Sequence, residues 1–389
     1  MERVPTRRQN ADVRVPPPGA GAFPALGMRI LEHYEIFEVN EGGFGRVLGL
    51  SDVRSGERMA AKIPKEHYTG ASGVDEFTRE VAIWIDLPAH ENIVTARFVR
   101  EVQGSPALFM DYVEGTTFRT LRELIRMGRA SLETTLDFGY QICLGMEAAN
   151  TNREVVHMDL KPENIMVEKG RTIKITDFGL AHRVRVVNGT YERKHAGSWP
   201  YAAPERFADQ PCDPRSDIYS VGVILYEMLT GRFPYPFDLA EDPSEMFQQL
   251  LAFHAKEGMY SVSNDIYHSG IPGAKGQIGD IVSTFLHPSR GERSRGFRQA
   301  RSLLQELGAK SKPIGTVGLT MAQRLSRAEG LQVIGEHSQA LAILNRLLTE
   351  EPDNGALYLA AAKSLEATGN QRSAKDFRER ALALLKQRP

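Results

Sequence analysis

The segment VVHMDLKPENIMV, residues 155–167, carries an aspartate, a lysine and an asparagine close together between two short β-rich flanks. Asp159, Lys161 and Asn164 are two and three residues apart, so one loop would present all three. An acid, a cation and an amide on one loop are groups that can handle a phosphate and its metal ion. Met158 stands directly before the acid, where a charged residue would be expected.

Length and charge limit the class of protein. At 389 residues the chain is too long for one average core, so two domains, or one large domain with an appendix, are expected. The 48 basic and 49 acidic side chains leave a formal charge of −1. No overall charge therefore favours binding to nucleic acid or to a membrane surface, and we expect neither as a partner.

Cysteine content and the N-terminal sequence bear on the compartment. Cys143 and Cys212 are the only cysteines, which excludes a disulfide framework and a cysteine-based zinc site and favours a reducing environment. The first residues are charged and contain prolines, and no apolar run is long enough to span a membrane. These features predict a soluble cytoplasmic protein.

The hydrophobic pattern changes along the chain. Residues 1–28 lack periodicity and contain a proline cluster, which predicts a flexible arm. From Tyr34, alternating β-branched segments predict three strands, and residues 107–113 predict another. A helix is expected between them at 75–87. Further helices are expected after Ser131 and at 217–231, 244–258, 278–286 and 298–307. The pattern predicts an α+β fold, with a small β-rich lobe before a larger helical one.

A glycine-rich turn, EGGFGRV, lies between the first two predicted strands at residues 41–47. Gly42, Gly43 and Gly45 lack Cβ atoms, so the backbone N–H groups of this turn could close over phosphate oxygens. Taken alone, the turn is more commonly just a β-hairpin connection. Its interpretation depends on the residues that follow.

Those residues come in a fixed order. Lys62 ends the third predicted strand, in MAAKIP, and Glu80 lies on the following helix with the charge needed to hold it. Asp177 begins the triplet DFG after the strand TIKIT, downstream of the 155–167 segment. A lone surface lysine and glutamate would be unremarkable. The whole ordered series does not arise by chance.

This series resembles the eukaryotic-type protein kinase superfamily, in its bacterial Ser/Thr branch, over about residues 29–308. The matching motifs are EGGFGRV, AAK, REV, HMDLKPEN, DFG at 177–179, APE at 203–205 and SDIYSVG at 216–222. The resemblance implies the bilobal protein-kinase fold. It also implies transfer of the γ-phosphate of ATP to Ser or Thr hydroxyls of protein substrates, including the kinase itself.

The resemblance assigns the catalytic roles. Asp159 would orient the incoming hydroxyl and take its proton, and Lys161 would neutralise charge on the γ-phosphate. Lys62, held by Glu80, would anchor the α and β phosphates. The Mg²⁺ ligands would be Asn164 and Asp177, with Mn²⁺ as an alternative ion. Nucleotide contacts would come from Gly42, Gly43, Gly45, Val47, Ala60, Lys62, Met110, Asp111 and Val113.

Family analogy also assigns structural and specificity roles. Asp217 would tie the catalytic-loop backbone to a C-lobe helix. Glu205 would pair with Arg293 or Arg295, and the spacing leaves the choice open. Lys161 in DLKPEN, with Ser198 at the position of a Thr that bonds to the catalytic Asp and Lys, favours Ser/Thr acceptors.

Two departures from the family pattern bear on activity. Met158 replaces the Arg that in many members binds a phosphate on the activation segment, so activity should depend little on such a phosphate. Asn40 replaces the first glycine of the loop, and asparagine tolerates the left-handed conformation that could keep the loop closed. Neither departure removes a catalytic group. The alternatives are a nucleotide-binding pseudokinase scaffold and a small-molecule kinase.

The last residues repeat themselves after a polar linker at 309–318. Paired residues recur 34 positions apart: Gly335 and Gly369, Ala340 and Ala374, Leu331 and Leu365, Ala328 and Ala362, Leu348 and Leu382. This period resembles the tetratricopeptide repeat over residues 319–389. Such helices would form a groove for a partner protein. Equally, they would dock on the kinase C-lobe or pair with another copy of the chain.

Overall fold

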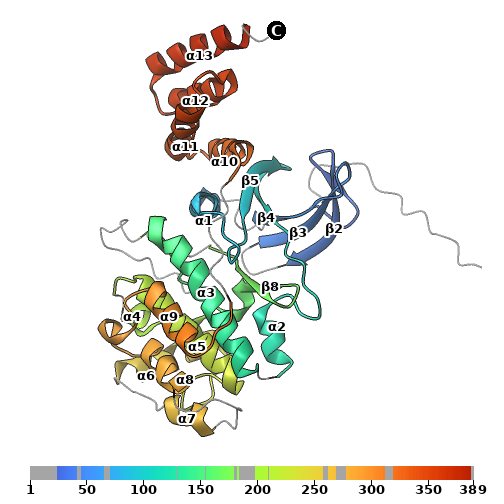
Figure 1. Ribbon diagram of the computed structural model, residues 1–389. Helices are drawn as coiled ribbons and strands as arrows, with labels where there is room; N and C mark the ends of the chain where they lie inside the picture. Colours follow the sequence, from blue (N-terminus) through green and yellow to red (C-terminus); the bar gives the residue numbers. More distant parts are fainter. Residues whose placement is uncertain are drawn as a thin grey trace, which may run out of the picture.

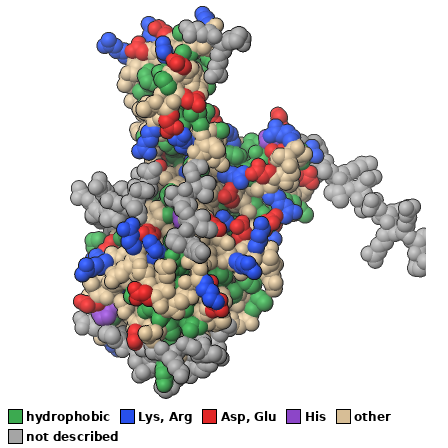
Figure 2. All heavy atoms as spheres, viewed as in Figure 1, with side chains coloured by type: hydrophobic (Ala, Val, Ile, Leu, Met, Phe, Trp, Pro, Cys, Tyr) green, Lys and Arg blue, Asp and Glu red, His purple; other side chains and the backbone are tan. Residues whose placement is uncertain are grey.

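The computed structural model comprises a sheet lobe, a helical lobe and a helical tail (Figure 1). It describes residues 24–41, 45–64, 71–128, 130–153, 155–178, 182–183, 198–208, 210–256, 262–268, 277–311 and 319–386. On the face shown in Figure 2, acidic and basic side chains are interspersed, as the near-zero formal charge predicts. No described helix is long and apolar enough to cross a membrane.

The sheet lobe is built on six antiparallel strands in the order β1-β2-β3-β4-β6-β5. The strands are β1 (Arg29–Ile30), β2 (Tyr34–Glu41), β3 (Gly45–Asp52), β4 (Arg58–Pro64), β5 (Ala96–Val102) and β6 (Ser105–Asp111). Helix α1 (Ala71–Asp86) lies between β4 and β5 in the chain. The three strands expected after Tyr34 and the one at 107–113 are all present. The predicted helix begins four residues earlier than expected, at Ala71 rather than at Asp75.

The two faces of this sheet bury different sets of side chains, because successive residues of a strand point to opposite sides. One face buries a core that includes Leu48, Leu50 and Phe109. On the other, Ala60 and Met110 share a core cluster with side chains of α1 and the helical lobe. The residues expected at the nucleotide site therefore lie on the face that joins the two lobes.

The helical lobe is organised around two long helices. Its helices are α2 (Leu121–Arg126), α3 (Leu132–Arg153), α4 (Pro204–Phe207), α5 (Pro214–Thr230), α6 (Pro243–Ala255), α7 (Val262–His268), α8 (Gln277–Phe285) and α9 (Phe297–Glu306). Helix α5 begins with a capping box, in which Asp213 and Ser216 each satisfy the other's backbone N–H. Gly231, at a φ of 73°, ends it. The sequence pattern predicted α3, α5, α6, α8 and α9 but not the short α2, α4 and α7.

Short elements carry the catalytic segment between the lobes. Strand β7 (Val155–Val156) pairs with β10 (His182–Arg183), and β8 (Ile165–Glu168) pairs with β9 (Thr172–Ile175). A 3₁₀ turn at Pro162–Asn164 precedes β8. Two further 3₁₀ turns lie at Trp199–Tyr201 and Arg290–Glu292. The catalytic segment is thus a loop between β7 and β8, as its β-rich flanks predicted.

The tail consists of four helices, α10 (Met321–Val333), α11 (His337–Glu350), α12 (Gly355–Ala367) and α13 (Gln371–Lys386). Gly335 and Gly369 occupy equivalent turns after α10 and α12, with φ of 82° and 83°. Only glycine adopts such angles without strain, which gives one physical reason for the spacing between them. Leu382 departs from its partner, because it is 55% exposed whereas Leu348 is buried.

The tail docks on the sheet lobe. Helix α10 lies against β5 (Figure 1), and Leu331 and Ala340 belong to the same core cluster as α1. The alternative of docking on the helical lobe is therefore wrong in this structure. The sequence pattern did not reveal the docking surface, because it is formed by strand β5 and the end of α1, far from the tail in sequence.

Candidate active site

The backbone of the catalytic loop is held by a buried carboxylate. Asp217, at the start of α5, accepts hydrogen bonds from the backbone N–H groups of His157 (2.7 Å) and Met158 (2.9 Å). Burial raises the pKa of Asp217 to about 7, and these two hydrogen bonds oppose that rise. Met158 adopts a φ of 68°, an uncommon conformation that the loop requires here. The geometry expected for Asp217 from family analogy is observed.

The three polar residues of the opening segment contact one another. The side-chain amide of Asn164 donates to the Asp159 backbone carbonyl (2.9 Å) and to its carboxylate (3.1 Å). The Lys161 ammonium lies 2.8 Å from the same carboxylate. Because the amide nitrogen of Asn164 is engaged, its amide oxygen is the atom with which it could bind a metal ion. Asp159 is thus held in one orientation from two sides.

A second cluster joins α1, β4 and the DFG triplet. The Lys62 ammonium lies 2.6 Å from a carboxylate oxygen of Glu80 and 2.7 Å from one of Asp177. Burial would lower the pKa of Lys62, but the two carboxylates raise it, so the ammonium stays charged. Burial likewise opposes ionisation of Asp177, yet Lys62 holds its pKa below the usual value.

An aromatic side chain links this cluster to the catalytic loop. Phe178 is fully buried, with its ring 4.6 Å from the His157 ring and 5.7 Å from the Trp84 ring, centroid to centroid. Trp84 belongs to α1, the helix that carries Glu80. The backbone of Asp177 has a φ of 63°, which turns the chain between its own side chain and Phe178. The position of α1 is thereby coupled to the position of Asp177.

The expected nucleotide-binding side chains lie on neighbouring strands. In the strand register Val47 pairs with Lys62, and Ala60 pairs with Met110. Lys62 and Ala60 are two apart on β4, so these four side chains share one face of the sheet. Ala60 and Met110 are buried, and Val47 is partly buried. This small apolar surface beside a buried ammonium could accept a purine base and its phosphates.

The remaining residues predicted to contact the nucleotide are Asp111, Val113 and the glycines of the loop. The carboxylate of Asp111 accepts a hydrogen bond from Arg97 (2.6 Å), and Val113 is buried. Gly45 begins β3, where an added Cβ would lie 2.5 Å from the Ile63 carbonyl oxygen, so strand pairing alone requires glycine there. Gly42 and Gly43 lie outside the described residues.

Asn40 does not use the left-handed conformation that asparagine tolerates. It lies in the extended strand β2, where it pairs with Val47, and it is absent from the residues with positive φ. Its side-chain amide donates to Glu38 (3.0 Å). Asn40 stays extended because the β2–β3 ladder continues past this position to Glu41.

The two residues predicted to bind a metal ion, Asn164 and Asp177, both carry oxygen donors. A carboxylate from Asp177 and an amide oxygen from Asn164 are hard oxygen donors, which Mg²⁺ prefers. Asn164 belongs to the Asp159 cluster and Asp177 to the Lys62 cluster, and phosphate oxygens could complete the coordination of an ion that these residues hold. The donor set therefore fits a magnesium ion bound together with a nucleotide.

The segment after DFG touches the site through backbone atoms. The backbone N–H of Ser198 donates to the Asp159 carboxylate at 3.4 Å, a contact that no hydroxyl is needed to make. The carbonyl of Met158 accepts from the Arg206 guanidinium at 2.8 Å. The activation-segment residues Thr190 and Tyr191, whose phosphorylation Met158 was expected to make unimportant, lie outside the described residues.

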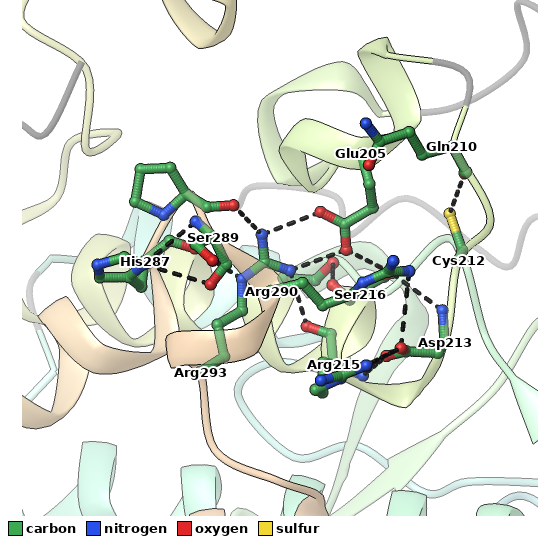
Figure 3. A network of polar contacts seen from close by, with 12 residues as sticks. Glu205, Gln210, Cys212, Asp213, Arg215, Ser216, His287, Ser289, Arg290 and Arg293 are labelled. Carbon is green, nitrogen blue, oxygen red and sulfur yellow. Dashed lines mark hydrogen bonds and ion pairs between the residues drawn. The ribbon is translucent and has the colours of Figure 1, made fainter. Parts of the chain in front are cut away.

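The APE glutamate is paired inside the helical lobe (Figure 3). Both carboxylate oxygens of Glu205 accept from Arg293, at 2.8 and 2.9 Å, and Ser216 donates a third hydrogen bond at 2.6 Å. Burial raises the pKa of Glu205, but these bonds hold it below its usual value. The geometry decides between the two candidates in favour of Arg293, since the Arg295 backbone N–H instead donates to Gln299.

One charged cluster near the catalytic loop was not predicted from the sequence. Arg122 of α2 donates to Glu163 (2.7 Å) and to Glu227 (2.5 Å), and Tyr201 also donates to Glu227 (2.5 Å). Glu163 belongs to the PEN triplet, which could have drawn attention to it. Nothing in the sequence around Arg122 marks it as a partner, because the cluster brings together residues from distant parts of the chain.

Known proteins resemble this chain over part of its length. A probable serine/threonine-protein kinase of Clostridium acetobutylicum is 35% identical over 216 residues, which is 55% of this chain and 32% of that protein. The serine/threonine-protein kinase PrkC of Bacillus subtilis is 33% identical over 213 residues, or 54% and 32%. An SNF1-related protein kinase catalytic subunit alpha, KIN12, of Arabidopsis thaliana is 31% identical over 242 residues, or 61% and 46%. The matched region thus spans less than half of each relative.

A family model covers more of the chain. The model described as the protein kinase domain matches residues 35–308, which include the sheet lobe from β2 onward and the helical lobe through α9. Both clusters around Asp159 and Lys62 lie inside this match. The chain therefore belongs to the protein kinase domain family.

Proposed function

We propose that the chain is an ATP-dependent protein kinase that phosphorylates Ser and Thr hydroxyls of proteins. The observation that carries this proposal is the buried Lys62 ammonium, within 2.7 Å of carboxylates from both Glu80 and Asp177. The family match supports it, and so do the relatives that carry the name serine/threonine-protein kinase. A charged lysine between two acids beside a fixed aspartate is suited to holding and cleaving a nucleotide phosphate.

Asp159 acts on the incoming hydroxyl. The hydroxyl oxygen attacks the γ-phosphorus, the bond from that phosphorus to the bridging oxygen breaks, and ADP carries away the electron pair. The hydroxyl proton passes to the Asp159 carboxylate, which its contacts with Asn164 and Lys161 hold in place. Lys161 also places a positive charge beside the transferred group, where negative charge is spread over the equatorial oxygens.

Lys62 anchors the nucleotide from the other side. Its ammonium contacts the α and β phosphates, while Glu80 fixes its position. Asn164 and Asp177 would hold the Mg²⁺, or Mn²⁺ in its place, and that ion supplies positive charge for the β and γ phosphates when it is bound. The adenine lies against the strand surface formed by Val47, Ala60 and Met110, next to the backbone of 111–113.

The tail is proposed to be a tetratricopeptide-like partner-binding unit. The recurrent buried pairs Ala328 with Ala362 and Ala340 with Ala374 support a repeat, because small side chains let antiparallel helices approach closely. A partner protein, or a second copy of the chain, would bind to it. The proposed domain division is an arm at 1–28, a kinase domain at 29–308, a linker at 309–318 and a repeat tail at 319–389.

Labelled ATP gives the direct test of activity. The purified chain, incubated with γ-phosphate-labelled ATP, Mg²⁺ and a generic basic protein, is expected to label that protein or itself on Ser and Thr. Asp177→Ala should abolish the label. The matched control is Asp376→Ala, which removes an exposed aspartate of α13 and should leave labelling unchanged.

Two outcomes would contradict the proposal. Nucleotide binding without any transfer from the wild type would favour a pseudokinase scaffold. Label on a small hydroxylated metabolite, with none on protein, would favour a small-molecule kinase.

A further inference from the structure

Helix α10 places a buried guanidinium at the end of helix α1. Arg327 is 5% exposed, and it donates to the backbone carbonyls of Leu87 (2.9 Å) and Ala96 (3.1 Å). Leu87 directly follows α1, and Ala96 is the first residue of β5. The last carbonyls of a helix lack intrahelical partners and carry partial negative charge. Arg327 therefore caps α1 with a cation that comes from the tail.

The backbone of α10 also approaches the sheet lobe closely. A Cβ added at Gly330 would lie 2.8 Å from the backbone nitrogen of Val99 and 3.3 Å from a methyl group of Ile85. Leu331, the next residue, is fully buried in the same core cluster as Ile85. At the rim, Arg100 of β5 lies 3.2 Å from Glu329. Charge, hydrogen bonding and apolar packing thus all join α10 to this surface.

The chain before α10 is attached to the other lobe. The Lys310 ammonium lies 2.5 Å from Glu133, and the side chain of Gln141 donates to the Ser311 hydroxyl at 3.2 Å. Both partners belong to α3 of the helical lobe. The chain is therefore fastened to the helical lobe at residues 310–311 and to the sheet lobe from α10 onward.

The capped end of α1 is mechanically close to the active site. Glu80 lies about two helical turns before Leu87, and a helix transmits position over that distance as a rigid body. Trp84, between them, donates its indole N–H to the Val94 carbonyl at 2.8 Å and packs against Phe178. Displacing the end of α1 would therefore move the carboxylate that holds Lys62.

We propose that Arg327 is a positioning residue for phosphoryl transfer. It fixes the end of α1 and thereby keeps Glu80 in contact with Lys62. The first helix of the tail, α10, would therefore contribute to the rate of phosphoryl transfer. The rate readout of this inference rests on the proposed function. Its exchange and binding readouts do not, so a failure of either proposal can be recognised separately.

The test compares Arg327→Met with Arg324→Met. Both remove a guanidinium from α10, but Arg324 pairs with Glu350 inside the tail, 2.5 Å away. Hydrogen exchange of residues 71–87, affinity for ATP, and the kcat and KM for ATP are measured for each. Arg327→Met should speed exchange in 81–87 and lower kcat/KM by about tenfold or more. Arg324→Met should leave exchange unchanged and kcat/KM within about twofold.

Two further variants separate positioning from a general loss of stability. Arg327→Lys keeps the charge and can serve one carbonyl, so its effects should have the same direction and smaller size. In a Glu80→Gln background, Arg327→Met should change kcat/KM by less than about threefold, because both residues act through one ion pair.

The proposal is overturned if Arg327→Met alters neither exchange in α1 nor affinity for ATP. It is also overturned if its full effect on the rate persists in the Glu80→Gln background. If the wild type transfers no phosphate, the proposed function fails, and the exchange and affinity data alone decide the role of Arg327.

Discussion

One buried ion cluster lies inside the helical lobe and another lies between the two lobes, and the clusters differ in how many carboxylates share the cation. In the helical lobe Arg293 meets Glu205 through two hydrogen bonds, and its remaining donors reach the carbonyls of His287, Pro288 and Arg215. Between the lobes, Lys62 faces two carboxylates at once, from Glu80 and Asp177. In the first cluster every donor of the guanidinium has an acceptor, whereas in the second one ammonium is shared by two carboxylates, and burial raises the pKa of Glu80 to about 7.

This difference suggests that the Arg293–Glu205 cluster stabilises the fold and that the Lys62 cluster serves catalysis. A complete bidentate pair needs nothing further, so its role is to hold Glu205 and the end of the helical lobe together. An ammonium shared by two carboxylates is suited to exchange partners when phosphates and a metal ion arrive. Lys62 and Glu80 are about as buried as Glu205, so burial of the ion pair alone does not mark the functional cluster. Substitutions in each cluster should therefore affect stability and catalysis to different degrees.

Removing Arg293 should damage stability far more than catalysis. Arg293→Met leaves the Glu205 carboxylate buried without its cation, which typically costs about 3–5 kcal/mol. Chemical denaturation of the purified variant measures the free energy of unfolding. The KM for ATP of the folded fraction should stay near the wild-type value. An unchanged free energy of unfolding would show that the Arg293–Glu205 pair does not hold the helical lobe together.

Removing Lys62 should damage catalysis far more than stability. Lys62→Met is expected to lower the rate of phosphoryl transfer by about 10²–10³, the usual loss for one electrostatic group in an active site. The unfolding free energy should fall less than in Arg293→Met, because the Asp177 side chain is 29% exposed and water and ions can reach its carboxylate when Lys62 is absent. The contrary result would be a variant that unfolds while the folded fraction transfers phosphate normally.

Acid should weaken the structural pair in a predictable range. The pKa of Glu205 is held below the ordinary value of 4.5, so the pair contributes stability above that pH and loses it as the pH falls toward the folded pKa. The unfolding free energies of wild type and Glu205→Gln should therefore converge by about half or more below pH 4.5. Denaturation curves at pH 7 and at pH values below 4.5 provide the check. A difference that is constant with pH would contradict the assigned charge.

The smallest effect is expected in the activation segment. Met158 has a thioether where many family members have a guanidinium, so it cannot bind a phosphate there. Thr190→Ala combined with Tyr191→Phe should leave the transfer rate within about twofold of wild type. Steady-state kinetics of the double variant test this. A tenfold loss would mean that other basic residues receive a phosphate in place of the missing arginine.

The sequence predicted those parts of the site whose chemistry is written in short motifs. Asp159 contacts Asn164, and Lys62 contacts Asp177, in line with the motifs, because each chemical role requires one residue type at one position. The sheet lobe followed by the helical lobe was predicted for a similar reason, since strand alternation and helical periodicity are local signals. Their roles in catalysis remain proposals.

The rest depended on contacts that no local pattern encodes. Arg293 could not be distinguished from Arg295, because only the folded backbone shows which guanidinium reaches Glu205. Asparagine tolerates a left-handed conformation, and only the strand pairing shows that Asn40 is extended. Nothing in the sequence around Arg327 distinguishes it from an ordinary arginine on a helix surface. In the folded chain it donates to two carbonyls more than two hundred residues away.

The central claim is that Asp159 works on the acceptor hydroxyl and not on the nucleotide. Single-turnover phosphoryl transfer and equilibrium ATP affinity, measured on Asp159→Asn and wild type with the same Ser/Thr protein substrate, test it most directly. The account predicts that transfer falls by about 10² or more, as for the loss of a general base, while ATP affinity changes by less than about threefold. Normal transfer by this variant, or equal losses in transfer and in affinity, would contradict the account.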